Sequence, residues 1–408
     1  MVMTDRADGM PHAHGESFPG GASTPVIIAT IFPEDGTTGV HTHFRQLRSF
    51  IEPHGIKVSI DTPFSWGRML TYPVFGPRLA LKYIHPPTSV IWYRHWHELF
   101  LYRALRRDLA RIGDCVIYAQ GPLEAKAALR ARTGPRQRVV MAVHFRTSQA
   151  DEHAEPGREL RRDSAAFRAI RDTERDVILR LDGIVYVAKW AQDALTGWLP
   201  EAASVPSIVV ANFVEPLHAG EGQPLIADIV TTGRLDERKN HRFLLEVLAE
   251  AKKAGHRLTL DIFGEGPQRR DLERRIAELG LDGQVNLRGY RRDVRDFLPR
   301  YRVYAHAAYG EVSPLAVIEA LAAGLPVLAP GIGPIAEICD DGVEGRFWPL
   351  DNPVKAAAIL LELLGSEPAR LMAATAAKER FHRDYDANVL GPRLTSFLLG
   401  ISPASAAY

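Results

Sequence analysis

Short apolar runs alternate with amphipathic stretches along the first half of the chain. The run VIIATIF, at 26–32, is apolar on both faces, as expected of a buried parallel strand. A helix is predicted over 40–55, because apolar residues recur at three- and four-residue intervals and Gly55 provides a stop. A strand over 56–63 then completes a βαβ unit. Five further strands are predicted at 89–93, 114–119, 138–145, 183–188 and 207–214.

The second half repeats this alternation from Leu225 onward. Strands are predicted at 227–233, 257–264, 284–289, 303–308 and 325–330. Helices are predicted at 240–255, 268–280, 294–301, 313–324 and 353–364. Each half is therefore predicted to be a doubly wound, Rossmann-like α/β domain. Two such domains that face each other enclose a cleft at the carboxyl ends of both sheets, where open α/β folds bind ligands.

A segment rich in polar and breaker residues, 211–224, is the predicted linker between the two halves. The first 24 residues are polar and lack the apolar core of a signal peptide. The nearly apolar run 315–336 is interrupted by Glu319 and by several glycines and prolines, which excludes a membrane span there. The predicted divisions are a disordered tail over 1–24, a first domain over 25–213, a second domain over 214–385, and a C-terminal helix and tail over 386–408 that crosses back to the first domain.

Composition excludes several classes of protein. The 408 residues are 46% hydrophobic and 24% charged, which excludes wholesale disorder. A formal net charge of +1 gives no basic field for nucleic acid. Cys115 and Cys339 are the only cysteines, so a disulfide framework is excluded and a reducing cytoplasm is the expected compartment.

The stretch EVSPLAVIEALAAG, which begins at Glu311, carries the sharpest chemical signal. Ser313 is predicted as the N-cap of a helix, and its free amides near Leu315 and Ala316 suit a phosphate. Glu319 lies about one and a half turns further, on an apolar face, where an unpaired carboxylate costs several kcal/mol. Sugar hydroxyls could serve as its partners; alternatively, a protein donor holds Glu319 and Glu311 is a solvated loop residue.

A second signal is the strand-to-helix loop GRLDERKN. Gly233 ends the strand, Asn240 is the predicted N-cap of the next helix, and Arg234 and Lys239 lie between them. A guanidinium and an ammonium in one such loop suit a diphosphate. The alternative is that both are solvated surface charges, and Arg238 is expected to be one.

Three glycine-bearing loops follow predicted strands and should face the same cleft. GEGP begins at Gly264, and GYRRDV places Tyr290 directly after a strand. In the first half, PEDGTTGV carries Gly36 and Gly39, which would permit the close approach of a phosphate. This loop is not GxGxxG, which argues against a dinucleotide fold.

In this order, these motifs resemble the family 4 retaining glycosyltransferases of the two-domain GT-B fold, from Val26 to the C-terminal helix. The family's glutamate pair matches Glu311, which the resemblance places at the transferred sugar, and Glu319, which it places at the ribose. Its G-R-x-x-x-x-K stretch matches Gly233, Arg234 and Lys239, which would grip the diphosphate.

The resemblance extends to the first half, with some departures. A family histidine near the sugar matches His144, and ANFVE at 211–215 is similar to the hinge-side asparagine stretch. Val312 stands where the family commonly has glycine, Gly333–Pro334 replaces two glycines, and the first glycine loop lacks adjacent glycines. These departures affect the identity of the sugar more than the family.

The resemblance implies an N-terminal acceptor domain, a C-terminal donor domain and a nucleoside-diphosphate sugar as donor, with UDP-sugar preferred over GDP-sugar. It implies transfer with retention to a carbohydrate or lipid-linked acceptor in envelope polysaccharide or glycolipid synthesis. No metal and no cofactor are expected, because the cations and the helix N-terminus supply the positive charge. The alternatives are a GT-B sugar-nucleotide epimerase and a non-enzymatic sugar-nucleotide binder.

One stretch bears on membrane contact. Residues 84–107 interleave aromatic residues with arginines and histidines, and Trp92, Trp96 and Phe100 follow helical spacing. Such a surface could make a peripheral contact with anionic lipid at the inner face of the membrane. The alternative is a crossover helix with its aromatic face in the core.

Overall fold

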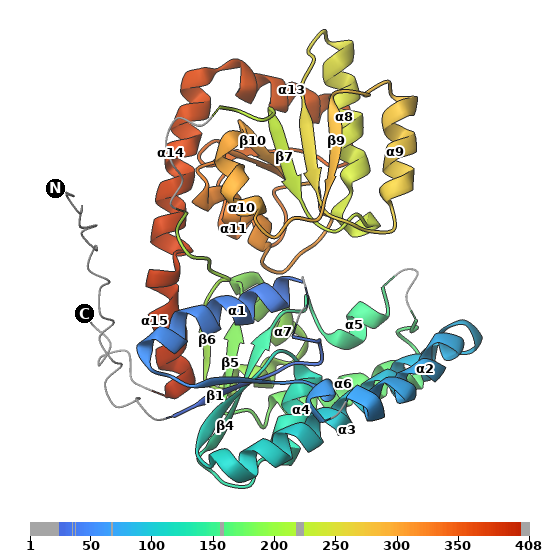
Figure 1. Cartoon of the computed structure of the whole chain (residues 1–408), viewed down its shortest axis with the longest axis vertical. Helices are drawn as coiled ribbons and strands as arrows, with labels where there is room; N and C mark the ends of the chain where they lie inside the picture. Colours follow the sequence, from blue (N-terminus) through green and yellow to red (C-terminus); the bar gives the residue numbers. More distant parts are fainter. Residues whose placement is uncertain are drawn as a thin grey trace, which may run out of the picture.

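The computed structural model describes residues 24–34, 36, 38–66, 68–155, 159–217 and 224–400, and it forms two α/β domains (Figure 1). The proposed tail, apart from Thr24, and the linker segment 218–223 lie outside the described residues. The first domain contains a six-stranded parallel sheet in the order β2-β1-β3-β4-β5-β6. Its strands are β1 (Val26–Ala29), β2 (Val58–Asp61), β3 (Cys115–Ala119), β4 (Gln137–Val143), β5 (Gly183–Tyr186) and β6 (Ser207–Val209).

The second domain contains another six-stranded parallel sheet, in the order β12-β11-β10-β7-β8-β9. Its strand order reverses between β7 and β10, and the crevice at such a point is where doubly wound sheets bind ligands. The strands are β7 (Ile229–Thr232), β8 (Leu260–Phe263), β9 (Val285–Gly289), β10 (Val303–Ala305), β11 (Val327–Ala329) and β12 (Gly345–Phe347). The predicted architecture of two doubly wound α/β domains is confirmed.

Helices cover both faces of the first sheet, as the buried apolar runs in its strands require. Its α-helices are α1 (Gly39–Ile51), α2 (Arg68–Ile84), α3 (Pro86–Ile112), α4 (Pro122–Ala131), α5 (Gln149–His153), α6 (Ala165–Ile178) and α7 (Lys189–Trp198). Three short 3-10 helices complete it: η1 (Glu52–His54), η2 (Pro63–Trp66) and η3 (Pro200–Ser204).

The second sheet is covered in the same way, with one apolar core on each face. Its α-helices are α8 (His241–Lys253), α9 (Arg269–Glu278), α10 (Val294–Phe297), α11 (Leu315–Ala322), α12 (Ile335–Ile338), α13 (Pro353–Gly365) and α14 (Glu367–Asp384). The 3-10 helices are η4 (Glu237–Lys239) and η5 (Leu298–Arg300).

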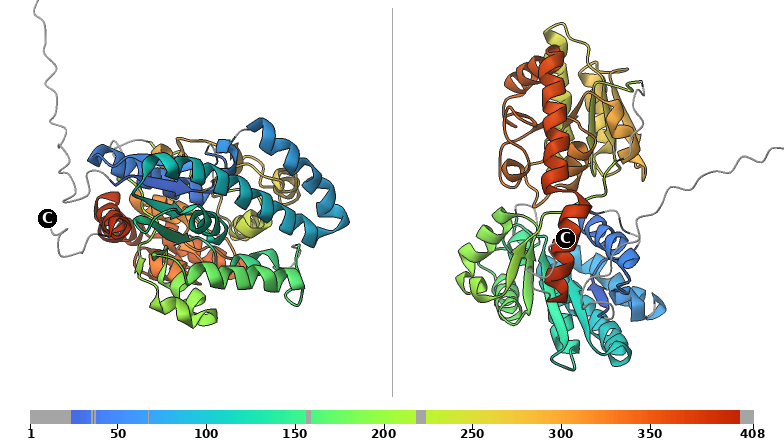
Figure 2. Two further views of the ribbon diagram at one scale, coloured as in Figure 1. Left: turned by 90° about the horizontal axis from the view of Figure 1, so that it is seen from below. Right: turned by 90° about the vertical axis from the view of Figure 1, so that its left-hand side faces the viewer.

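The chain returns to the first domain through α14 and the helix that follows it, α15 (Ala387–Leu399), which run along one side of the molecule (Figure 2). Helix α15 packs against the first sheet, with Leu390, Leu394 and Leu398 in the same core as Phe44. At the junction the two crossing segments bond to each other: Val214 N–H donates to Tyr385 O (3.3 Å) and Ala387 N–H donates to Val214 O (3.1 Å). This pairing joins the two segments that connect the domains.

The prediction of a strand at 89–93 is wrong, because these residues lie within α3. Helix α3 packs against α2 as a hairpin, with Trp96 stacked on Phe100 and the Trp92 indole donating to Val74 O (2.9 Å). The aromatic residues therefore contact one another at helical spacing, and their β propensity is overridden by this packing. Phe100 is buried in this hairpin, whereas Trp92 and Trp96 are half-buried.

Candidate active site

The loop from His306 to Pro314 follows β10 and leads into α11 at the point where the second sheet reverses its strand order. Helix α11 begins at Leu315 with Pro314 as its N-cap, so the prediction of Ser313 as the cap is wrong. The Ser313 carbonyl accepts a hydrogen bond from Asn212 of the first domain (2.9 Å). Val317 is the first amide of α11 with a partner in the described residues, which leaves the amides of Leu315 and Ala316 available to an anion.

Glu311 is held by two cations of the facing loop. Its carboxylate forms ion pairs with Lys239 Nζ and with Arg238 Nη1 (3.2 Å). Burial alone would raise the pKa of Glu311, but Lys239, His306 and Arg238 outweigh it and the pKa lies below its ordinary value. Glu311 is therefore ionised, and Arg238, expected to be a solvated charge, is part of the site.

The loop that follows β7 presents Lys239. Asp236 accepts a hydrogen bond from the Lys239 amide (3.2 Å) and so caps η4. Asn240 adopts a left-handed conformation (φ 52°), which asparagine tolerates better than most residues. Asn240 is the N-cap of α8, as predicted, although its side chain makes no capping hydrogen bond to the helix. Its buried Nδ2 has no hydrogen-bond partner within the described part of the chain.

The backbones of two loops touch where glycine is required. A Cβ on Gly264 would lie 1.8 Å from Gly233 O, so the GEGP loop supports the loop that bears Arg234. The Arg234 side chain extends into solvent and lies 3.7 Å from Asp236. Gly264 therefore contributes to the site through its backbone contact with the loop that bears Arg234. The exposed Arg234 side chain has room to turn toward a ligand.

Glu319 lies deeper in α11 beside Arg295, with 4.0 Å between its Oε1 and the arginine Nε. Within the described residues its carboxyl makes no hydrogen bond, which does not support the alternative that a protein donor holds it. Burial raises the pKa of Glu319 to about 7 against the opposing effect of Arg295. A ligand with hydroxyl groups would supply the donors that this carboxyl lacks. Tyr290, at the end of β9, is half exposed.

Gly39, at the end of the first glycine loop, lies beside the start of α11. A Cβ on Gly39, the first residue of α1, would lie 3.8 Å from the Leu315 side chain. A Cβ on Gly36 would overlap the His41 ring, which is bonded to Thr38 Oγ1 (2.7 Å) and Pro33 O (2.8 Å). The imidazole of His41 therefore links Pro33 to Thr38, and glycine at 36 leaves room for it.

His144 follows β4 and is joined to a buried polar cluster. Gln120 donates through its amide to Tyr118 O, so its Oε1 accepts from His144 Nε2 (3.1 Å) and leaves His144 Nδ1 as an acceptor. Burial, together with the neighbouring His43, holds the pKa of His144 well below its ordinary value. The neighbouring His43 bonds to Asn212 Oδ1 (2.8 Å), and Asn212 in turn bonds to the Glu311 loop.

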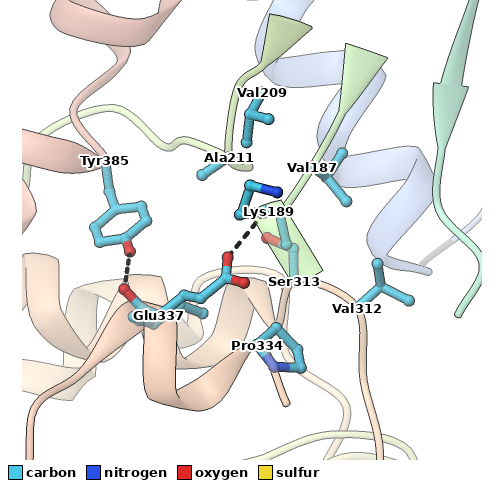
Figure 3. Close-up of a pocket in the computed structure, with 11 residues that line it drawn as sticks. Val187, Lys189, Val209, Ala211, Val312, Ser313, Pro334, Glu337 and Tyr385 are labelled. Carbon is cyan, nitrogen blue, oxygen red and sulfur yellow. Dashed lines mark hydrogen bonds between the residues drawn. The ribbon is translucent and has the colours of Figure 1, made fainter. Parts of the chain in front are cut away.

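A further contact between the domains was not predicted. Glu337 of α12 accepts from the amides of Lys189 (2.9 Å) and Trp190 at the start of α7. The residue at the N-cap of α7 is Ala188, which has no side-chain acceptor, so the second domain caps a helix of the first. Figure 3 shows this contact at the edge of a cavity of about 120 Å³ that is also lined by Ser313 and Tyr385. Glu337 gave no signal in the sequence, because a cap supplied from another domain leaves no local pattern.

The described residues contain no cluster of three His, Cys, Asp or Glu side chains placed to hold a metal ion. No helix in this part of the chain is both long and apolar enough to cross a bilayer.

The predicted residues thus come together from two sides. The switch point of the second sheet is surrounded by Gly233, Lys239, Glu311, Leu315 and Ala316. Gly39 of the first domain faces this group through its proximity to Leu315. This arrangement places cations and free amides beside one ionised carboxylate and a second, largely unpaired one. It suits a ligand that carries both phosphate and hydroxyl groups.

Parts of the chain are similar to known proteins. Residues 227–366 match the family described as glycosyl transferases group 1. The chain is similar to an exopolysaccharide phosphotransferase of Streptomyces coelicolor, with 30% identity over 182 residues, which are 44% of this chain and 19% of that protein. It is also similar to the amylovoran biosynthesis glycosyltransferase AmsK of Erwinia amylovora, with 27% identity over 184 residues, 43% of this chain and 45% of AmsK. The chain thus spans less than half the length of both relatives.

The fold also matches a solved structure. HepE of Anabaena, crystallised with UDP-glucose, superimposes with a TM-score of 0.67 and 16% identity, over 93% of this chain and 100% of HepE. The similarity extends across both domains, whereas the family match covers the second.

Proposed function

We propose that this GT-B chain, whose residues 227–366 match the group 1 glycosyl transferases, transfers a sugar from a UDP-sugar to an acceptor hydroxyl in the synthesis of an envelope polysaccharide or glycolipid. The observation that carries the proposal is the grouping of Lys239, Glu311 and the free amides of α11 at the switch point. The relatives' roles in exopolysaccharide and amylovoran synthesis support the acceptor class.

In the proposed mechanism, the diphosphate lies between Arg234, Lys239 and the amides of Leu315 and Ala316. These groups stabilise the negative charge that develops on the leaving diphosphate, as fixed donors do in other enzymes. Glu319 accepts hydrogen bonds from the ribose, and Glu311 from hydroxyls of the sugar. The positive charge that a metal ion would supply comes from these cations and the helix N-terminus.

The first domain supplies the other side of the transfer site. His144 keeps a free Nδ1 acceptor, because its Nε2 is committed to Gln120. It would orient the sugar or the acceptor hydroxyl from across the cleft. Transfer with retention follows if the departing phosphate takes the acceptor proton on the face that it leaves. No second carboxylate nucleophile is then needed, unlike in retaining hydrolases.

Acceptor and membrane contact are parts of the same proposal. Tyr83 and Ile84, at the turn between α2 and α3, are exposed by 86% and 78%. They are the apolar groups through which a bilayer carrying a lipid-linked acceptor would be reached. GDP-sugar remains the alternative donor.

The test is a screen of UDP- and GDP-sugars with purified protein and sugar acceptors, in which nucleotide release and product mass are followed. A glycosyltransferase releases UDP and forms a glycosylated acceptor. An epimerase converts the sugar without an acceptor, and a binder gives neither product. Either of the last two outcomes, with donor bound, would refute the proposed reaction.

A further inference from the structure

A buried chain of hydrogen bonds runs from the first domain to the loop that carries Glu311. His43 of α1 lies at its centre, where Nδ1 bonds to Asn212 Oδ1 (2.8 Å) and Nε2 bonds to the Tyr118 hydroxyl (2.9 Å). The Asn212 amide then donates to the Ser313 carbonyl of the second domain (2.9 Å). His43, Asn212 and Tyr118 are exposed by only 3%, 4% and 0%, so water does not compete for these bonds.

The partners fix the direction of each bond in this chain. A carbonyl oxygen can only accept, so the Asn212 atom that faces Ser313 is the amide nitrogen and the atom that faces His43 is its oxygen. His43 therefore carries its proton on Nδ1. Burial lowers the pKa of His43 to about 4, so the ring is neutral and Nε2 accepts from the Tyr118 hydroxyl. Each group thus donates toward the second domain.

The His43 ring also touches His144, the histidine that the proposed function places beside the sugar or the acceptor. The ring centroids lie 4.7 Å apart, and the planes meet edge to face at 74°. Gln120 holds His144 as well, because its Oε1 accepts from the histidine Nε2 (3.1 Å). His43 thus contacts His144 directly. It reaches the Glu311 loop through one side chain, that of Asn212.

The Ser313 carbonyl joins the two domains at the donor site. It lies in the backbone between Glu311 and Leu315, and the Leu315 amide is assigned to the diphosphate in the proposed mechanism. Without the bond from His43, the buried oxygen of Asn212 loses a donor, and the amide is free to turn away from Ser313. The position of the Glu311 loop relative to the first domain therefore depends on His43.

Building on the proposed function, we propose that His43 is a positioning residue that keeps the Glu311 loop aligned with His144 during sugar transfer. It acts on the second domain through Asn212 and on His144 through its ring. In this scheme His43 touches neither the donor nor the acceptor. The groups assigned to the diphosphate lie in the second domain and are held by their own loop and helix. The loss of His43 should therefore slow turnover and leave nucleotide binding intact, since a small displacement of the reacting groups can slow a reaction about a hundredfold.

The test is His43→Phe, which keeps an aromatic ring against His144 and removes both hydrogen bonds. Turnover is measured as UDP release from the UDP-sugars of the screen above and is expressed per UDP-binding site. Calorimetry gives the number of sites and the affinity for UDP. Turnover per site should fall about 10- to 100-fold, and the dissociation constant for UDP should change less than about threefold. A role confined to stability would lower the number of sites and the melting temperature but leave turnover per site unchanged, which would overturn the inference.

Further variants separate a positioning role from the general effect of replacing a buried histidine. Asn212→Ala removes the link to Ser313 by itself and should cause a similar fall in turnover, so the test does not depend on one variant folding. Because His43 and Asn212 act through one bond, the double variant should be no more than about threefold slower than either single variant, and multiplied effects would contradict the chain. His97→Phe is the matched control: His97 is a buried histidine of α3 bonded to Tyr93 O (2.8 Å), and its replacement should alter stability alone.

A measurement on the wild-type protein checks the chain itself. In ¹⁵N-histidine-labelled protein at pH 7.5, the adjacent rings of His43 and His144 should be neutral and of opposite tautomers, with the proton on Nδ1 of His43 and on Nε2 of His144. A His43 ring that is protonated on Nε2 would overturn the inference. Unchanged turnover per site in His43→Phe and Asn212→Ala would do the same, and either result leaves the proposed function intact. Wild-type protein that releases UDP from none of the UDP-sugars overturns the proposed function and this inference together.

Discussion

Substitution of Glu311 by glutamine should make the protein bind UDP more tightly while it turns over more slowly. In the free protein, Glu311 forms an ion pair with Lys239. The Glu311 side chain is 10% exposed and the Lys239 side chain is 13% exposed. A diphosphate must displace this carboxylate to reach the ammonium group. Glutamine preserves the shape of the side chain and removes the competing charge.

The magnitude follows from the bond that is lost. A charged hydrogen bond contributes about 1.5–3 kcal/mol, and the removal of like-charge repulsion acts in the same direction. A gain of about 1.4–2.8 kcal/mol corresponds to UDP binding that is roughly 10- to 100-fold tighter. Turnover should fall by at least about tenfold, because the sugar hydroxyls lose their charged acceptor in the transition state.

Calorimetry with UDP at pH 7.5, beside turnover with the intact donor, measures both effects. Glu362→Gln is the matched control, since Glu362 is an exposed carboxylate paired with Arg346 and should leave both unchanged. Lys239→Ala should weaken UDP binding. If Glu311→Gln weakens UDP binding to the same degree as Lys239→Ala, Glu311 supports the nucleotide site rather than competing for it, and the reasoning is refuted.

Four further outcomes are expected. Burial raises the pKa of Glu319 from 4.5 to about 7, so the folded state binds this proton more tightly than the unfolded state, and the free energy of unfolding falls as the pH rises through this window. Glu319→Gln should therefore raise the free energy of unfolding by about 1–3 kcal/mol at pH 8 and leave it unchanged at pH 4.5. Urea titrations at both pH values can verify this. In Glu337→Ala, two amides at the start of α7 lose the acceptor that the second domain supplies. This variant should lower kcat/KM for the donor about 5- to 30-fold and enlarge the radius of gyration in solution scattering. An unchanged radius of gyration would argue against Glu337 as a contact that holds the domains together. Arg234→Ala should lower turnover about a hundredfold with an unchanged melting temperature, and wild-type turnover at saturating donor would exclude Arg234 from the diphosphate site. Turnover should survive EDTA; a complete loss that only Mg²⁺ or Mn²⁺ restores would contradict the charge arrangement proposed here.

The fold could be predicted from the sequence because its signals are local and repeated. Buried parallel strands are short apolar runs, and each is followed by a breaker and an amphipathic helix, so the two doubly wound sheets follow from the pattern. The exception at 89–93 has a physical reason. Its β-branched and aromatic residues satisfy a strand pattern and a helix pattern equally well, and the packing of α3 on α2 decides between them.

The candidate site could be predicted only in part. Lys239 and Glu311 were identified from their loops, but their ion pair joins residues 72 positions apart, and neither spacing nor composition reports such a pair. The role of Arg238 depends on the same long-range contact. The N-cap of α11 is Pro314 and not Ser313, whose carbonyl accepts a hydrogen bond from Asn212 of the other domain. Contacts that form between domains leave little trace in a local pattern.

Helix α15 has a consequence for the order in which the protein can be made. Leu390, Leu394 and Leu398 complete a core that otherwise belongs to the first domain. They are synthesised only after the whole of the second domain, so the part of this sheet face that α1 does not cover remains exposed throughout translation of residues 214–385. The second domain, whose strands and covering helices are contiguous in the chain, can fold as it emerges from the ribosome. The domain that is translated first is therefore completed last, and a ribosome that stalls before Leu390 leaves an apolar sheet face open to chaperones.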